Sequence, residues 1–271
     1  MSLQNNEEKI GFYVCCFVDI LGQKENLLQL NSFQDIRNNK DEINKIFQKT
    51  YGNIKRFREE VDNSIKFINQ KIKDHQLPNL QSSNSIKVKS FSDLIINYIL
   101  LGNNPVQFQG IYFLLMLNCI IFLNMLAKGI PLRGGIDVGL AIETKDEIYG
   151  TALIKPYILE SKVAKSIRIV IGQELYNYIQ EIAHGNSNCE SEQYNVRYAQ
   201  LCQKLIKQDT DSEYILDYLS DEFHSLKSFK TLTKEANIFL RKEHNKLKVN
   251  GNFEVTKKYQ RAMRYFKSRN I

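Results

Sequence analysis

The chain has 271 residues, of which 43% are hydrophobic and 25% are charged. This balance excludes an intrinsically disordered chain, and the length is enough for one large domain with a substantial core. The net charge of +7 favours anionic partners, but only residues 257–269 concentrate basic side chains, so nucleic acid is not expected as a partner.

The first predicted element is a strand over residues 10–19, which is rich in aromatic and β-branched residues and ends at Asp19. Gly22 then allows a tight turn into a helix. Within residues 35–75, apolar side chains recur in steps of three and four from Ile43 onward. This spacing predicts one long amphipathic helix, inserted after the first strand.

A strand hairpin comes next, with its arms at residues 86–92 and 94–101 and with Asp93 near the bend. Residues 106–128 predict a buried helix. The most apolar part of this helix, residues 111–127, is shorter than the ~20 residues of a bilayer span and is interrupted by two asparagines. We therefore expect a core helix and no membrane span.

A glycine-rich strand is predicted over residues 132–142, followed by a charged turn at 143–147. Residues 151–165 predict a helix, provided that Pro156 lies near its first turn, where a missing N–H is tolerated. A short apolar strand follows at residues 167–171.

The last part of the chain predicts a helix at residues 173–183, a polar loop at 184–194 and mostly helix beyond. This order of elements predicts an α+β fold, in which a sheet is covered by helices on one face. We expect a single domain over residues 1–271, with its core at 10–172 and a helical C-terminal extension at 173–271.

Asp19 and Asp93 each stand in an apolar, β-branched run, where a carboxylate without a partner loses favourable hydration. Two such carboxylates on neighbouring strands suit hard divalent cations, because Mg²⁺ needs only one or two protein carboxylates beside substrate oxygens and water. That arrangement is typical of phosphoryl chemistry. The alternative is that Asp19 caps the following helix and that Asp93 closes a turn.

Several segments, taken in order, carry a family resemblance. They are FVDILG at 17–22, KSFSDL at 89–94, LRGGI at 132–136 with Gly139, GTAL at 150–153, YILE at 157–160 with Ala164, and RIV at 168–170. Together they resemble a class III nucleotidyl cyclase domain of the adenylate and guanylate type. The likeness is greatest to the bacterial pyrimidine cyclases of Pycsar-type anti-phage defence. Residues 258–270 also resemble the C-terminal tail that is common in those proteins.

The resemblance implies a ferredoxin-like core that works as a homodimer and binds a nucleoside triphosphate between its subunits. It implies that Asp19 and Asp93, with the Ile20 carbonyl, hold two Mg²⁺ or Mn²⁺ ions. The ribose 3′-hydroxyl would then attack the α-phosphate and release pyrophosphate. The product would be a 3′,5′-cyclic nucleotide, made from UTP or CTP more than from a purine triphosphate.

Substrate-binding positions also follow from the resemblance. Backbone N–H groups in the turn at Ile20, Leu21 and Gly22, at a helix N-terminus, would receive the triphosphate. Lys89 and Glu147 stand where the purine cyclases carry a base-selecting pair, although the pyrimidine branch builds its base pocket differently. Without that role, Lys89 is an ordinary strand residue and Glu147 a turn charge.

The sequence departs from the purine cyclases at Ile154 and Ile158, where they carry an asparagine and an arginine that offsets phosphate charge. Arg133 is the first candidate for a replacement cation, because it opens a strand beside two glycines that permit close approach of a ligand. Arg168 and Lys162 are weaker candidates.

Glu160 is expected to be structural and paired with Lys162, Lys165 or Arg168. The isoleucines at 154 and 158 leave open a second function, a catalytically silent nucleotide-binding or scaffold subunit. A third function, nucleic-acid binding, is motivated by the net charge alone and requires an affinity that falls steeply with salt.

The chain has five cysteines without CxxC spacing, which fits a reducing compartment. Its first nine residues are polar and acidic, which is unlike a secretory signal. We therefore expect a cytoplasmic protein.

Overall fold

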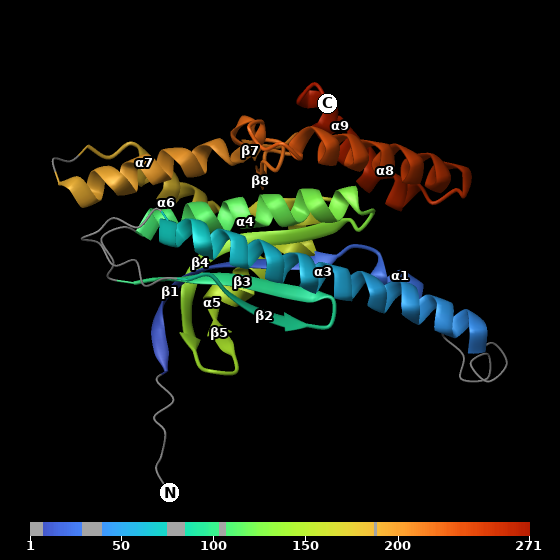
Figure 1. The fold of residues 1–271 in the computed structure, drawn as a ribbon, viewed down its shortest axis with the longest axis horizontal. Coiled ribbons are helices and arrows are strands. Elements are labelled where there is room, and N and C mark those ends of the chain that lie inside the picture. Colours follow the sequence, from blue (N-terminus) through green and yellow to red (C-terminus); the bar gives the residue numbers. More distant parts are fainter. Residues whose placement is uncertain (1–7, 29–39, 75–84, 103–106, 187–188) are drawn as a thin grey trace, which may run out of the picture.

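The computed structural model describes residues 8–28, 40–74, 85–102, 107–186 and 189–271. Its strands are, in chain order, β1 (Lys9–Ile20), β2 (Lys87–Phe91), β3 (Leu94–Leu101), β4 (Leu132–Glu143), β5 (Ile148–Gly150), β6 (Ile169–Ile171), β7 (Ile206–Gln208) and β8 (Tyr214–Leu216). They form one sheet in the order β2-β3-β1-β4-β6-β8-β7, and β5 pairs with β4 outside this row. In Figure 1 the hairpin of β2 and β3 lies below α3.

Helices lie between most of these strands and make up most of the C-terminal part. They are α1 (Gln23–Leu28), α3 (Lys40–Asp74), α4 (Gln107–Ala127), α5 (Thr151–Ile158), the π-helix η1 (Leu159–Ala164), α6 (Gln173–Ala183), α7 (Glu190–Lys204), the 3₁₀-helix η2 (Asp221–Phe223), α8 (Phe229–Val249) and α9 (Phe253–Ser268). The described part of the predicted 35–75 insertion is the helix α3.

The core of the fold is ferredoxin-like. The strands β2, β3, β1 and β4 are neighbours in that order, and each adjacent pair is antiparallel. Along the chain, helices separate β1 from β2 and β3 from β4, which gives the β-α-β-β-α-β order of this motif. The α+β fold with an antiparallel-rich sheet is therefore confirmed, and β6 adds one parallel pair beside β4.

Helices cover both faces of the sheet rather than the single face expected from the sequence. Val14, Cys16 and Val18 of β1 belong to the large core beneath α3 and α4. Tyr13, Cys15 and Phe17 point to the opposite face, where they meet Ala152 of α5 in a second, smaller core. Alternate residues of a strand face opposite sides, so one apolar strand can supply both cores.

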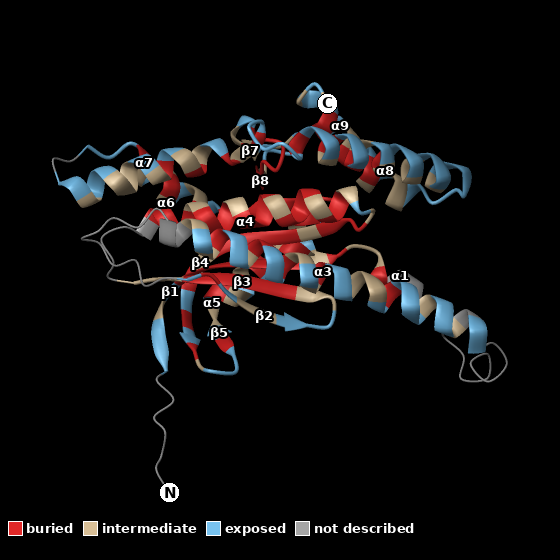
Figure 2. Ribbon diagram, viewed as in Figure 1, coloured by how far each residue is buried: buried red, intermediate tan, exposed pale blue. Residues whose placement is uncertain are grey.

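The helix α4 lies between the sheet and the C-terminal helices (Figure 1). It has no charged residue, and most of it is buried, as its predominantly red ribbon in Figure 2 shows. By length and composition, Phe108–Ala127 could cross a membrane, but 67% of its most apolar stretch is buried within the protein. That burial is typical of a core helix, as the sequence predicted.

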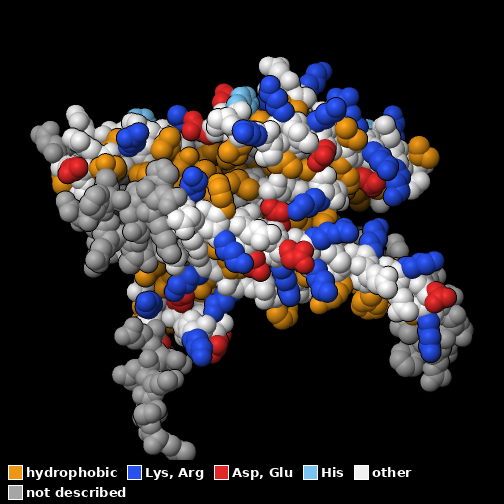
Figure 3. Space-filling model, viewed as in Figure 1, with side chains coloured by type: hydrophobic (Ala, Val, Ile, Leu, Met, Phe, Trp, Pro, Cys, Tyr) orange, Lys and Arg blue, Asp and Glu red, His pale blue; other side chains and the backbone are white. Residues whose placement is uncertain are grey.

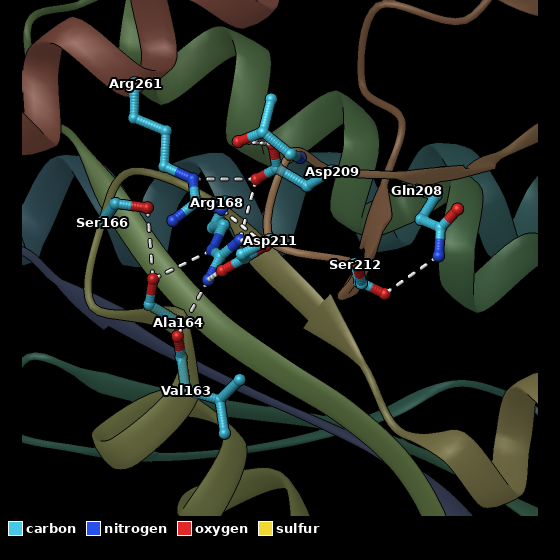
Figure 4. A network of polar contacts seen from close by, with 10 residues as sticks. Val163, Ala164, Ser166, Arg168, Gln208, Asp209, Asp211, Ser212 and Arg261 are labelled. Atoms are coloured by element: carbon cyan, nitrogen blue, oxygen red, sulfur yellow. Dashed lines mark hydrogen bonds and ion pairs between the residues drawn. The ribbon is translucent and has the colours of Figure 1, made fainter.

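The C-terminal extension is mostly helical, with two short strands that the sequence did not predict. The strands β7 and β8 join the sheet edge beside β6, and α7 begins within the polar loop expected at residues 184–194. An ion-pair network holds this extension to the core. In Figure 4 the Arg168 guanidinium lies between Asp209 and Asp211, and Arg261 of α9 reaches Asp209 from the other side.

Candidate functional site

The pairing of the strands brings the two predicted aspartates together at one end of the central strands β1 and β3. Asp19 pairs with Leu94 of β3, and Asp93 is the residue immediately before Leu94 in the β2–β3 turn. Arg133 of β4 pairs with Asp19 on the other side of β1. The negative charge of Asp93 contributes to the raised pKa of Asp19, as expected for two carboxyl groups on neighbouring residues of paired strands.

The turn that carries Asp93 is held in place by α3. Ser92 has a positive φ of 53°, an uncommon conformation for a residue other than glycine. The Arg58 guanidinium of α3 donates a hydrogen bond to the Ser92 carbonyl at 2.8 Å. Arg58 is a positioning residue that sequence reasoning missed, since nothing local indicates that a helix residue 34 positions earlier meets this turn.

Arg133 lies between two carboxylates. Its guanidinium donates to the Asp19 Oδ2 at 3.2 Å, and its Nε contacts Glu160 Oε1 in an ion pair. The Glu160 side chain is only 4% exposed. The expectation that Glu160 would pair with a nearby lysine or with Arg168 is therefore wrong. Glu160 belongs to the same cluster as Asp19.

The π-helix η1 delivers Glu160 to the sheet. A Cβ on Gly135 would lie 2.4 Å from the Pro156 carbonyl oxygen and 2.5 Å from Leu159 Cβ, so only glycine lets this helix approach β4 so closely. Pro156 sits inside α5, and not in its first turn as expected. Since proline removes one hydrogen bond of an α-helix, the widening into η1 directly after it has a local cause.

Burial and charge raise the pKa of Asp19 from 3.8 to about 7. Burial is the main cause, the negative charges of Asp93 and Glu160 add to it, and Arg133 opposes it. Burial also raises the pKa of Glu160, again against the effect of Arg133. One arginine thus serves a partly buried cluster of acids, and a further cation would relieve their mutual repulsion.

These residues fit a hard divalent cation with few protein ligands. Within the described residues, no group of three or more His, Cys, Asp or Glu side chains is arranged to hold a metal ion. Mg²⁺, however, commonly uses one or two carboxylates together with substrate oxygens and water. Asp19 and Asp93 supply that number, and burial, together with the charges of Asp93 and Glu160, raises the pKa of Asp19 even though Arg133 is its partner.

The turn after β1 has fewer available backbone N–H donors for a phosphate than the sequence suggested. The Leu21 N–H donates to the Pro131 carbonyl at 2.9 Å, so the expected contribution of Leu21 is already engaged. Gly22 has a positive φ of 90°, which confirms the tight turn. Gln23 begins the short helix α1 and donates from its amide to the Thr50 carbonyl.

Lys89 reaches the turn between β4 and β5, as its expected pairing with Glu147 requires, but its partner there is not Glu147. The Lys89 ammonium donates to the Lys145 carbonyl at 2.6 Å, and Glu147 is exposed. The lysine lines a cavity of about 470 Å³ on the α5 side of the sheet. The acid in that cavity is Glu143, which accepts hydrogen bonds from Lys87 and Tyr98.

The basic residues considered as a replacement cation differ in whether they contact Asp19. Arg168 is 3% exposed and binds Asp209 and Asp211, so it is a structural residue and no replacement for the missing arginine. Arg133 alone among the sequence candidates contacts Asp19 within the described residues. Ile154 and Ile158 are 50% and 40% exposed on α5, which leaves apolar side chains at the positions of the usual asparagine and arginine.

The raised pKa of Asp19 predicts a pH dependence of stability in metal-free protein. Between pH ~4 and ~7 the folded chain holds a proton that the unfolded chain has released, so the free energy of unfolding falls as pH rises. We expect Asp19→Asn to remove on the order of 4 kcal/mol of this fall, as measured by urea unfolding across the range. Part of the slope should remain, because burial also raises the pKa values of Glu160 and Asp137. Identical slopes in the variant and the natural protein would contradict the assignment.

No protein-family model and no curated protein matches this chain. Among solved structures, the chain is similar to the adenylyl cyclase CyaB from P. aeruginosa, with 14% sequence identity and a TM-score of 0.39. The match covers 65% of this chain and 83% of that one.

Proposed function

We propose that this chain is a metal-dependent nucleotidyl cyclase, which converts a nucleoside triphosphate into a 3′,5′-cyclic nucleotide and pyrophosphate. The observation that carries the proposal is the strand register of a ferredoxin-like core, which pairs Asp19 with Leu94 and so brings it next to Asp93, beside Arg133. The motifs of the class III cyclases stand in order along the same chain. They also support a pyrimidine substrate and a part in anti-phage signalling, and the cysteines without CxxC spacing support a cytoplasmic location.

Each residue of the cluster would have a separate task. Asp19 and Asp93, with the Ile20 carbonyl, would hold two Mg²⁺ or Mn²⁺ ions, which neutralise phosphate charge and acidify the attacking hydroxyl. Arg133 would offset negative charge on the α-phosphate, since it is the arginine that already touches Asp19. Glu160 would fix the direction of Arg133 from its buried position in η1.

A homodimer is part of the proposal. Ile154, Tyr157 and Ile158 leave an exposed apolar side on α5, close to the site because the Tyr157 ring lies 5.4 Å from that of Phe17. Phe17 and Asp19 point to the same face of β1, two residues apart. A second copy that covers this side of α5 would bury the isoleucines and close the substrate site.

A catalytically silent nucleotide-binding subunit is the second candidate, and the exposed Ile154 and Ile158 favour it. Without the usual asparagine and arginine, the site would bind a metal and triphosphate but stabilise the transition state less. Calorimetry separates the two, because metal-dependent binding of a triphosphate without release of pyrophosphate identifies the silent subunit.

The direct test is incubation of the purified chain with ATP, GTP, CTP and UTP in Mn²⁺, followed by mass spectrometry. The proposal expects a cyclic nucleotide and pyrophosphate from at least one triphosphate, and a pyrimidine product in preference. If no triphosphate yields a cyclic product, the chain is not a cyclase.

Metal binding has its own readout. We expect Mn²⁺ to raise the melting temperature, because a ligand that binds only the folded state stabilises it by mass action. The increase should vanish in the double variant Asp19→Asn/Asp93→Asn and persist in Asp146→Asn, where an exposed acid of the β4–β5 turn is neutralised instead. An equal increase in all three proteins would place the metal elsewhere.

A further inference from the structure

The positive charge of the chain is concentrated in its last two helices. Residues 229–268, which span α8 and α9, contain eleven lysines and arginines and three glutamates. Their net charge of +8 exceeds the +7 of the whole chain, so the remaining residues together are close to neutral. The sequence pointed to residues 257–269 alone, but the structure packs α8 along α9, and Figure 3 shows Lys and Arg side chains gathered over both helices.

One side of α8 carries basic residues and no acid. Exposed residues recur along the helix at steps of three and four, which places them on one side of it. We call this series the α8 stripe, and its members are Lys230, Lys234, Ile238, Arg241, Asn245 and Lys248. Two of the three glutamates of the hairpin pair instead with Lys246 and Lys257. Within the described part of the chain no acid forms an ion pair with the stripe, so its charge is available to an anionic partner.

Two apolar side chains project at the tip of the hairpin, directly beside this charge. Val249 ends α8 and Phe253 begins α9, and they are 87% and 70% exposed. Among the large hydrophobic side chains that the structure describes, Val249 is the most exposed. The turn between the two is fixed by backbone hydrogen bonds, such as that from the Asn252 N–H to the Leu247 carbonyl at 3.1 Å. The hairpin therefore presents both side chains to solvent in a defined position.

We propose that the α8–α9 hairpin binds the surface of a membrane that contains anionic phospholipids. The α8 stripe would meet the lipid phosphates, and Val249 and Phe253 would enter the boundary between the headgroups and the acyl chains. A cluster of basic residues on a helix, next to exposed apolar side chains, is the combination that anionic lipid surfaces attract. From Lys230 to Lys248 the helix rises about 27 Å, so the basic residues of the stripe can contact different lipids.

Nucleic acid would attract the same charges but leaves the apolar side chains unexplained. Contacts to nucleic-acid phosphates need basic groups alone, and bases stack on aromatic side chains. Ile238 and Val249 are aliphatic, and both are more than half exposed. A lipid surface accounts for both features, because charge draws the hairpin to the headgroups and apolar side chains enter the layer beneath them.

Co-sedimentation of the full chain with lipid vesicles tests this proposal, and its readout is separate from cyclase activity. We expect vesicles of mixed phosphatidylglycerol and phosphatidylcholine to bind at least tenfold more tightly than vesicles of phosphatidylcholine alone, and the difference to shrink as salt is added. Double-stranded DNA is the competitor. Equal binding to both kinds of vesicle, or release of the chain from anionic vesicles by an equal concentration of DNA phosphate, would overturn the proposal.

Charge reversals place the contact on the α8 stripe. Lys234→Glu/Lys248→Glu should weaken binding to anionic vesicles at least tenfold. The control, Lys45→Glu/Lys66→Glu, makes the same change of charge at exposed positions of α3 and should bind as the natural chain does. All four substitutions are at the surface, so the melting temperature should stay unchanged. Equal loss of binding in both double variants would show a response to net charge alone and would overturn the assignment to α8.

The tip can be followed by fluorescence, because the natural chain has no tryptophan. We expect anionic vesicles to shift the emission of Phe253→Trp to the blue and brominated lipids to quench it. Tyr149→Trp, at a side chain of β5 that is 72% exposed, should show neither effect. Val249→Ser/Phe253→Ser keeps every charge and should weaken vesicle binding at least fivefold. An unshifted emission of Phe253→Trp on bound vesicles, or unchanged binding by the serine variant, would contradict insertion of the tip.

Discussion

Asp93→Asn should reduce cyclase turnover in Mn²⁺ by roughly 10³-fold or more, which corresponds to about 4 kcal/mol of lost transition-state stabilisation. Asparagine keeps the size and hydrogen-bonding capacity of the side chain, and it tolerates turn conformations well. What it removes is the charge that, with Asp19, would hold the metal ions. The measurement is the initial rate of pyrophosphate release with the preferred triphosphate.

The same substitution should not destabilise the fold. Since the charge of Asp93 raises the pKa of Asp19, its removal should lower that pKa toward its ordinary value and relieve repulsion within the cluster. We expect the melting temperature of metal-free Asp93→Asn to equal or exceed that of the natural chain. Asp146→Asn is the matched control, with the same change of charge at an exposed position and full activity expected. An Asp93→Asn protein that keeps full activity would remove Asp93 from the catalytic site.

The elements around the site could be predicted because their signals are local. The strand β1 is marked by a β-branched run and a glycine turn and ends one residue beyond the predicted Asp19, and β3 begins and ends where the hairpin pattern placed it. The apolar composition of α4 likewise predicted its burial. In each case a few consecutive residues determine both the type of element and its limits.

The contacts within the site could not be predicted, since they join residues far apart in the sequence. Glu160 meets Arg133 only because α5 and η1 cross β4 at Gly135, and helix-spacing rules pointed instead to lysines nearby. The adjacent glycines at 134 and 135 were the available signal, because a glycine pair in a strand indicates that another backbone approaches closely. In the same way, only the folded structure brings the Leu21 N–H to the Pro131 carbonyl.

The short strands were missed for a different reason. With three residues each, β7 and β8 are too brief for an alternating pattern to emerge. Their place in the sheet is set by the turn between them, where Asp209 and Asp211 face Arg168. The basic and acidic residues that fix the C-terminal extension are 41 and 43 positions apart, beyond the reach of any local rule.

Arg168→Ala should destabilise the protein by about 3–5 kcal/mol, because it breaks a buried ion-pair network by removing one partner. The variant would remove the Arg168 hydrogen bonds to the Val163 and Ala164 carbonyls at the end of η1, of which, among the described residues, only Ala164 keeps a side-chain donor, Ser166. Among the arginines, it would leave Asp209 and Asp211 with Arg261. The measurement is urea unfolding at neutral pH, with Arg241→Ala on the exposed side of α8 as control.

The same variant should change how the free energy of unfolding depends on pH below about 4. Burial opposes ionisation of Asp211, but hydrogen bonds from Arg168 and Arg261 outweigh it and hold the pKa of Asp211 well below its usual range. The stability that this carboxylate contributes is present above the unfolded pKa near 4 and is lost as pH falls further. Arg168→Ala should therefore flatten the loss of stability in acid. It should also speed hydrogen exchange in η1, whose opposite end presents Glu160 to Arg133. A variant that unfolds within 1 kcal/mol of the natural chain, with unchanged exchange in η1, would show that the network neither anchors the C-terminal extension nor supports the site.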